Sequence, residues 1–151
     1  MKPIYKIFSA AFVGTTFMTL YSYYRAGKEN QQYREPVLLN KLLNRSNALP
    51  VKVGDNHPAG WVGHYAVGVL FVIAYYALWK RALHSPGPVR TATIGTMSGL
   101  LAIGAWKTMF AANDNPPAND RSGYYRQLFV AHLIFSAFAL AAYKASEKAT
   151  E

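Results

Sequence analysis

The sequence predicts an all-α fold: a polytopic membrane protein built as a four-transmembrane-helix bundle, with a short interfacial amphipathic helix in the first loop. Two observations predict it. Charged side chains gather in blocks and leave four long stretches with few or none, and Trp and Tyr rings gather near the ends of those stretches. The 151 residues fit one membrane domain. The mean hydropathy of +0.02 is therefore an average of apolar spans and basic loops.

The first two spans are predicted over 4–24 and 61–79. Residues 7–24 carry no charge, which is enough to cross a hydrocarbon core of about 30 Å at about 1.5 Å per residue. Residues 61–79 contain no Asp, Glu, Lys or Arg, and no polar face recurs there with the helical period that a soluble helix requires. The N-terminal lysines are also typical of a signal peptide, but the Tyr-rich residues after the first span lack a small-residue cleavage site. We therefore expect an uncleaved first helix.

The last two spans are predicted over 91–110 and 124–143. Lys107 interrupts the third span close to its end, where a long side chain can reach the headgroups. The aromatic rings near the span ends favour the membrane interface, because they are amphipathic. These rings belong to Trp61, Tyr65, Tyr75, Tyr76, Trp79, Trp106, Tyr124, Tyr125 and Tyr143.

The predicted interfacial helix covers 36–47 in the first loop. Its leucines follow a helical repeat on one side, and its polar and basic residues lie on the other, which is typical of a helix on anionic lipid. The alternative is a cap packed on the bundle. Pro36 suits the first position of such a helix in either case.

The distribution of basic residues predicts the topology. The loop 80–90 holds Lys80, Arg81 and Arg90 with no acid, which places it and both chain termini in the cytoplasm. The first loop is the contrary signal, because its bases outnumber its acids, Glu29, Glu35 and Asp55. The excess of basic residues, which gives the net charge of +9, is thus explained by the topology and by contact with the lipid bilayer. No stripe of bases and aromatic rings indicates a nucleic-acid partner.

Small residues predict close helix packing. Gly95 and Gly99 form a GxxxG motif in the third span, Gly104 extends it, and Gly68 lies on a similar face of the second span. Small residues four positions apart let two helices approach closely in lipid. Such faces serve either packing within one bundle or association into a homodimer or larger membrane complex.

His64 and His132 are the candidate site residues. His64 lies three residues after Trp61, and His132 lies four residues after Leu128. If Trp61 and Leu128 mark the same membrane boundary, both rings are expected at similar depth, because the second and fourth spans run in the same direction. An ionisable group at membrane depth is costly and is a functional hypothesis by default. The pair could bind haem or a metal, contact a quinone or relay a proton, or only fix helix packing. Nearby polar candidates are Tyr65, Tyr125, Arg126 and Ser136.

Two motifs carry a resemblance to a known family. They are Gly60-Trp61-Val62-Gly63-His64-Tyr65 in the second span and Ala131-His132-Leu133-Ile134-Phe135 in the fourth. From Pro58 to Tyr143 the chain resembles a family of small, uncharacterised bacterial integral-membrane proteins, a domain of unknown function with Gly-Trp-x-x-His-Tyr and Ala-His-x-x-Phe motifs. The resemblance implies a four-helix architecture and the bacterial inner membrane, and it implies no reaction.

Three functions follow as hypotheses. The first is a non-enzymatic accessory or assembly subunit without a cofactor, because the chain has no hydrolase, metalloprotease or phosphate-binding motif. The second is a redox or cofactor-binding protein that uses His64 and His132. The third is a small transporter subunit. The lack of cysteine excludes disulfides and thiolate metal sites in all three.

Overall fold

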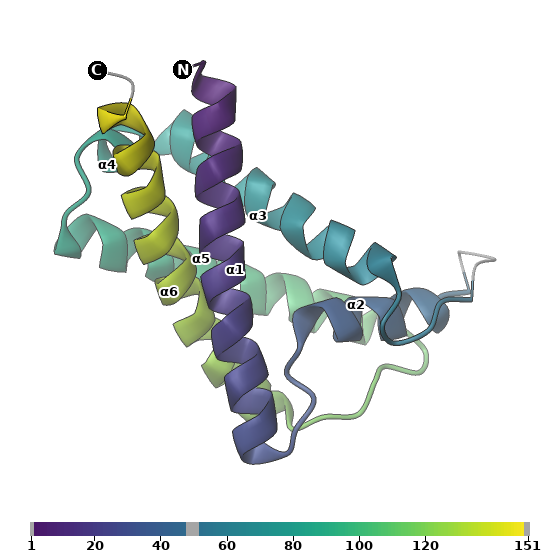
Figure 1. Ribbon diagram of the computed structural model, residues 1–151. Coiled ribbons are helices and arrows are strands. Elements are labelled where there is room, and N and C mark those ends of the chain that lie inside the picture. The colour runs from purple at the N-terminus through teal and green to yellow at the C-terminus, as the bar shows by residue number, and fades with distance from the viewer. Residues whose placement is uncertain (1, 48–51, 150–151) are drawn as a thin grey trace.

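The computed structural model describes residues 2–47 and 52–149, and these ranges contain six helices and no strands (Figure 1). The prediction of an all-α fold is confirmed. The helices are α1 (Pro3–Glu29), α2 (Glu35–Asn44), α3 (Pro58–Leu78), α4 (Lys80–His84), α5 (Pro88–Ala111) and α6 (Arg121–Lys148).

Local sequence explains where the helices begin and end. Prolines occupy the first turn of α1, α2, α3 and α5, where a missing backbone N–H costs nothing. His57 caps α3, because its Nδ1 accepts a hydrogen bond from the backbone N–H of Ala59 at 3.1 Å. Asn30 ends α1 in the left-handed conformation, with a φ of 50°.

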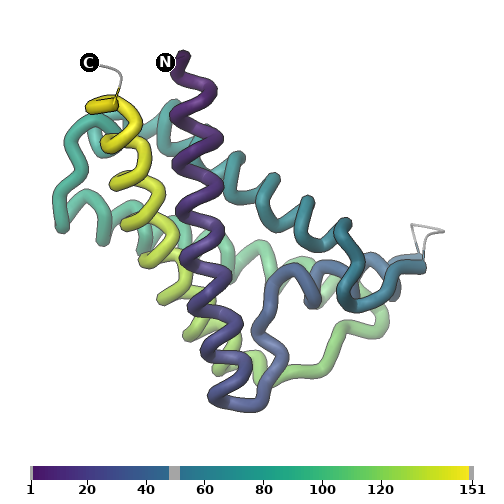
Figure 2. The backbone as a smooth tube through the Cα atoms, viewed as in Figure 1, coloured from purple at the N-terminus to yellow at the C-terminus, as the bar shows by residue number. Residues whose placement is uncertain are grey.

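The long helices pack around an antiparallel pair. Helices α1 and α6 run side by side in opposite directions, α5 packs obliquely against α6, and α3 packs obliquely against α1 (Figures 1 and 2). A β-carbon added at Gly14 of α1 would lie 2.9 Å from Ala139 of α6, so the small residue allows this close approach. The arrangement differs from a bundle of four near-parallel helices, because α3 and α5 diverge from the central pair.

One end of the molecule gathers the start of α1, the end of α6 and α4 (Figure 1). The His84 ring of α4 hydrogen-bonds the Glu147 carboxylate of α6, and the ammonium group of Lys6 lies 4.0 Å from the same carboxylate. The loop predicted over 80–90 therefore contains a short helix. Only Trp79, in a non-helical conformation, separates this helix from α3.

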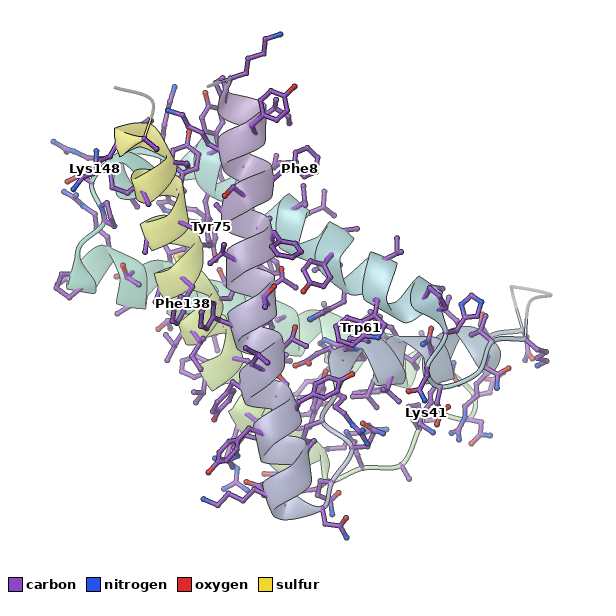
Figure 3. All side chains as sticks on the ribbon, viewed as in Figure 1. Phe8, Lys41, Trp61, Tyr75, Phe138 and Lys148 are labelled. Carbon is purple, nitrogen blue, oxygen red and sulfur yellow. The ribbon has the colours of Figure 1, made fainter. Side chains whose placement is uncertain are left out.

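Helix α2 is a cap wedged beneath α3. It is shorter than the predicted 36–47, and its first four residues are buried, so the chain covers it on all sides there. Leu38 and Leu42 pack in one cluster with Trp106 of α5 and Leu128 of α6. Lys41 points outward to Asp55, and it lies at the opposite end of the molecule from Lys148 (Figure 3).

Two helices, α3 and α6, are long and apolar enough to cross a membrane by length and composition. Among the described residues, α1 and α5 do not meet the same limits of length, hydropathy and charge. Length and composition therefore indicate two candidate spans and do not establish four. All four long helices nevertheless expose large apolar side chains, as Phe8 does on the outer face of α1 (Figure 3). Others include Phe12, Leu20, Val62, Leu70, Ile73, Leu100, Leu101 and Phe138.

Candidate functional site: a cavity lined by two histidines

A cavity of about 120 Å³ is enclosed mainly by residues of α3, α5 and α6, with single residues or pairs from α1 and α2. Its walls are mostly apolar, and the only titratable side chains among its described lining residues are His64, His132 and Glu35. The apolar lining comes from five helices: Met18, Leu39, Val67, Gly68, Phe71, Ala102, Trp106, Met109, Leu128 and Phe135. The cavity thus unites the two candidate histidines, which lie far apart in the sequence.

His64 is held by α1. Its Nε2 lies 2.8 Å from the Thr19 hydroxyl, which itself donates to the backbone carbonyl of Thr15 at 2.6 Å. Gly68 makes this approach of α1 and α3 possible, because a β-carbon there would lie only 2.0 Å from the Thr15 hydroxyl oxygen. The ring is therefore fixed in orientation by its neighbouring helix, and its side chain is almost fully buried.

His132 is held by its own helix. Its Nδ1 lies 2.9 Å from the backbone carbonyl oxygen of Leu128, one turn earlier in α6. Phe71 of α3 packs edge-on against the ring, with 5.2 Å between the ring centroids. Both histidine rings thus have one nitrogen in a hydrogen bond and sit against apolar neighbours in the same cavity.

Glu35 is the site residue that sequence reasoning missed. The sequence places it among the acids of the first loop, whereas its side chain is 1% exposed at the start of α2. Its Oε1 accepts hydrogen bonds from Ser22 at 2.7 Å and from the Gln127 amide at 3.3 Å. Its Oε2 is buried without a hydrogen-bond partner among the described residues.

Burial raises the pKa of Glu35 to about 7, and the hydrogen bonds from Ser22, the backbone and Gln127 offset only part of that rise. The carboxyl group therefore exchanges its proton near neutral pH. The signal in the sequence was its position before Pro36, at the start of a predicted amphipathic helix. That signal was not strong enough to distinguish a buried acid from a solvated helix start.

The other polar candidates have different roles. Ser136 belongs to a buried hydroxyl cluster, in which the Tyr75 hydroxyl lies 2.6 Å from Ser98 and 2.8 Å from Ser136. This cluster joins α3, α5 and α6. The Tyr65 hydroxyl lies 2.9 Å from the Thr16 hydroxyl. None of these tyrosines and serines lines the cavity among the described residues. Tyr125 and Arg126, which the sequence suggested as nearby polar candidates, do not line it either.

The GxxxG motif packs inside the molecule. A β-carbon added at Gly95 would lie 2.9 Å from Leu133, and one at Gly99 would lie 2.9 Å from Phe129, both on α6. Gly104 differs, because a β-carbon there would meet nothing within 4 Å. Of the two interpretations of these glycines, the contacts of Gly95 and Gly99 correspond to packing within one chain.

The donor set restricts which metal or cofactor fits. The described residues contain no group of three His, Asp, Glu or Cys side chains placed to hold a metal ion, whereas protein sites for zinc use three or four ligands. Haem would have to take Nδ1 of His64, because Nε2 bonds Thr19. That nitrogen is crowded by the residue's own β-carbon, which disfavours a broad macrocycle.

Comparison with known proteins found no family model, no curated protein and no solved structure that matches the chain. The resemblance to a bacterial four-helix membrane family therefore stays a prediction.

Proposed function

We propose that this chain is a multi-pass membrane protein that binds a lipophilic small molecule of the quinone class in its central cavity. The observation that carries the proposal is the meeting of His64, His132 and Glu35 in a cavity that is otherwise apolar. Apolar walls with a few oriented polar groups are typical of small-molecule sites. The ring of such a ligand would contact Phe71 and Trp106, while its two ring oxygens need polar partners, which the two imidazoles and the Glu35 carboxyl group would supply.

Several contacts favour binding over the accessory-subunit hypothesis. Most of the small-residue faces that would have joined a partner are occupied within the chain, since Gly68 packs on α1 and Gly95 and Gly99 pack on α6, and only Gly104 among the four predicted glycines is open. The histidines, by contrast, each keep one ring nitrogen without a hydrogen-bond partner in the described parts of the chain. Packing alone does not require two such nitrogens in one cavity.

The proposal includes four membrane spans, formed by α1, α3, α5 and α6. Support comes from the large apolar side chains that all four helices expose, because an exposed apolar surface of this extent is unusual in a soluble monomer. The basic segments before α1, around α4 and at the end of α6 lie together at one end. We propose that this end faces the cytoplasm of a bacterial cell and that the membrane is the inner membrane.

Single cysteines test this topology, because the natural chain has none. Ser85, beside α4, and Ala118, in the loop between α5 and α6, are both exposed. In spheroplasts, a membrane-impermeant maleimide should label Ala118→Cys directly and Ser85→Cys only after the membrane is permeabilised. Labelling of both variants without permeabilisation would contradict four spans with cytoplasmic termini.

Ligand binding is tested by fluorescence quenching at Trp106, which lines the cavity. With Trp61 and Trp79 replaced by Phe, Trp106 is the only indole in the chain. Titration of this protein in lipid nanodiscs with decylubiquinone, and separately with decylubiquinol, should quench the fluorescence in a saturable manner for at least one of the two forms. Quenching that rises linearly with the ligand content of the lipid for both forms would contradict the proposed site.

Two alanines of α5 provide matched variants. Ala102 is buried and lines the cavity, whereas Ala105 is exposed on the same helix. Ala102→Phe should fill the cavity and weaken saturable quenching by at least about tenfold, while Ala105→Phe should leave it unchanged. If both variants still quench like the parent protein, the quinone binds elsewhere, and the accessory-subunit hypothesis becomes the better explanation.

A further inference from the structure

The hydrogen bonds of the two histidines define which ring nitrogens carry protons. A neutral imidazole has one N–H donor and one bare acceptor nitrogen, and the partner of one nitrogen decides the role of the other. Neither ring has a carboxylate among its described hydrogen-bond partners. A buried imidazolium without a counter-ion is costly, so both rings are treated as neutral.

The Thr15–Thr19 pair decides the tautomer of His64. The Thr19 hydroxyl has one proton, and it donates that proton to the Thr15 carbonyl at 2.6 Å. The hydroxyl oxygen can then only accept from His64, so the ring nitrogen Nε2, at 2.8 Å, carries the proton. The remaining nitrogen, Nδ1, is a bare acceptor.

The backbone of α6 decides the tautomer of His132. A carbonyl oxygen only accepts hydrogen bonds, so the contact of 2.9 Å with Leu128 requires a proton on Nδ1 of the ring. The other nitrogen, Nε2, is then bare. The cavity therefore holds two imidazoles that each offer an acceptor and no donor to a ligand.

We infer that the cavity selects the reduced, dihydroxy form of a lipophilic quinone over the oxidised form, with the hydroxyls of the ligand donating to Nδ1 of His64 and Nε2 of His132. The inference rests on the proposed function and adds the redox state of its ligand. A quinol has two O–H donors, whereas a quinone has only carbonyl acceptors, which would face bare acceptor nitrogens. A site that leaves buried polar groups unpaired rejects a ligand strongly.

Thr19 is a positioning residue in this arrangement, because it is absent from the cavity lining and acts through His64. Thr19→Val removes the acceptor for Nε2–H and lets the ring adopt the other tautomer, which presents an N–H to the cavity. The preference for quinol should then fall towards equal binding of both forms. Thr19→Ser keeps the hydroxyl and should restore the preference.

The ligand test compares three probes by titration calorimetry under anaerobic conditions: decylubiquinol, decylubiquinone and the dimethyl ether of decylubiquinol, which lacks both hydroxyl protons. The quinol should bind the wild-type protein at least about tenfold more tightly than either other probe. Equal affinity for quinol and quinone would overturn the inference and leave the proposed function in place. If none of the three binds, the proposed function fails as well.

The tautomers are tested without any ligand. Nitrogen-15 NMR of histidine-labelled protein distinguishes protonated from bare ring nitrogens, and His64→Gln and His132→Gln assign the two signals. We expect Nε2–H for His64 and Nδ1–H for His132, and a switch of the His64 signal in Thr19→Val but not in Thr19→Ser. A proton on Nδ1 of His64 in the wild-type protein would overturn the inference.

Discussion

Gly60→Ala is expected to destabilise the protein by about 3 kcal/mol or more, because no movement of a side chain can make room for the added methyl group. A β-carbon at Gly60 would lie 2.0 Å from the backbone carbonyl oxygen of Pro36 and 2.8 Å from the Asn40 side chain. Asn40 in turn donates to the backbone carbonyls of Asp55 and His57 at 2.9 and 2.7 Å. The substitution therefore separates α2 from α3 and disturbs the loop that joins them.

Gly63→Ala is the matched control, one turn further along the same helix. Its added β-carbon would lie 3.7 Å from Leu39, which is ordinary contact. Alanine favours a helix over glycine by about 1 kcal/mol, so this variant should match or exceed the wild-type stability. Thermal unfolding of the detergent-purified proteins, followed by circular dichroism, measures both. Equal midpoints for the two variants would show that α2 does not pack on Gly60 as described.

Glu35→Gln is expected to remove a pH-dependent loss of stability. The native pKa of Glu35 is raised to about 7 by burial, above its unfolded value of 4.5, so the native state binds more protons between these limits. Stability of the wild-type protein should therefore fall as the pH rises from 4.5 through 7. At about 1.4 kcal/mol per pKa unit, the full loss is about 3 kcal/mol above pH 7.

The glutamine variant has no proton to lose at this position, so its advantage over the wild-type protein should grow from pH 5 to pH 8. Chemical unfolding at several pH values measures the difference. Glu29→Gln is the control, because Glu29 is a partly exposed residue that pairs with Arg25 and its removal leaves Glu35 in place. If Glu35→Gln and the wild-type protein show the same pH dependence, Glu35 ionises without cost and is not buried in the native state.

Much of the helical structure could be predicted from where charges are missing. The four predicted spans lie almost entirely within α1, α3, α5 and α6, because long uncharged apolar stretches form helices in either lipid or a protein core. The boundaries were less accurate. The polar ends of α6, which continues to Lys148, are stabilised by contacts such as that between Lys144 and Glu147 rather than by hydropathy.

The candidate site was predicted only in part. His64 and His132 could be singled out because an ionisable residue in an apolar stretch is conspicuous, and the parallel direction of two helices predicted a similar depth. Glu35 and Thr19 could not. Glu35 lies in a stretch rich in charge, and Thr19 is one of several hydroxyl residues in α1. Their roles arise from contacts across 92 and 45 positions of the chain, to Gln127 and His64 respectively.

The helical character of this protein and its apolar segments could be predicted from the sequence, because hydropathy and helix signals depend on neighbours along the chain. The packing of the helices was needed to show that α2 is a buried cap, that Gly95 and Gly99 face α6, and that the two histidines line one cavity. Burial and hydrogen bonding depend on distances between helices, and periodicity along one chain does not contain these distances.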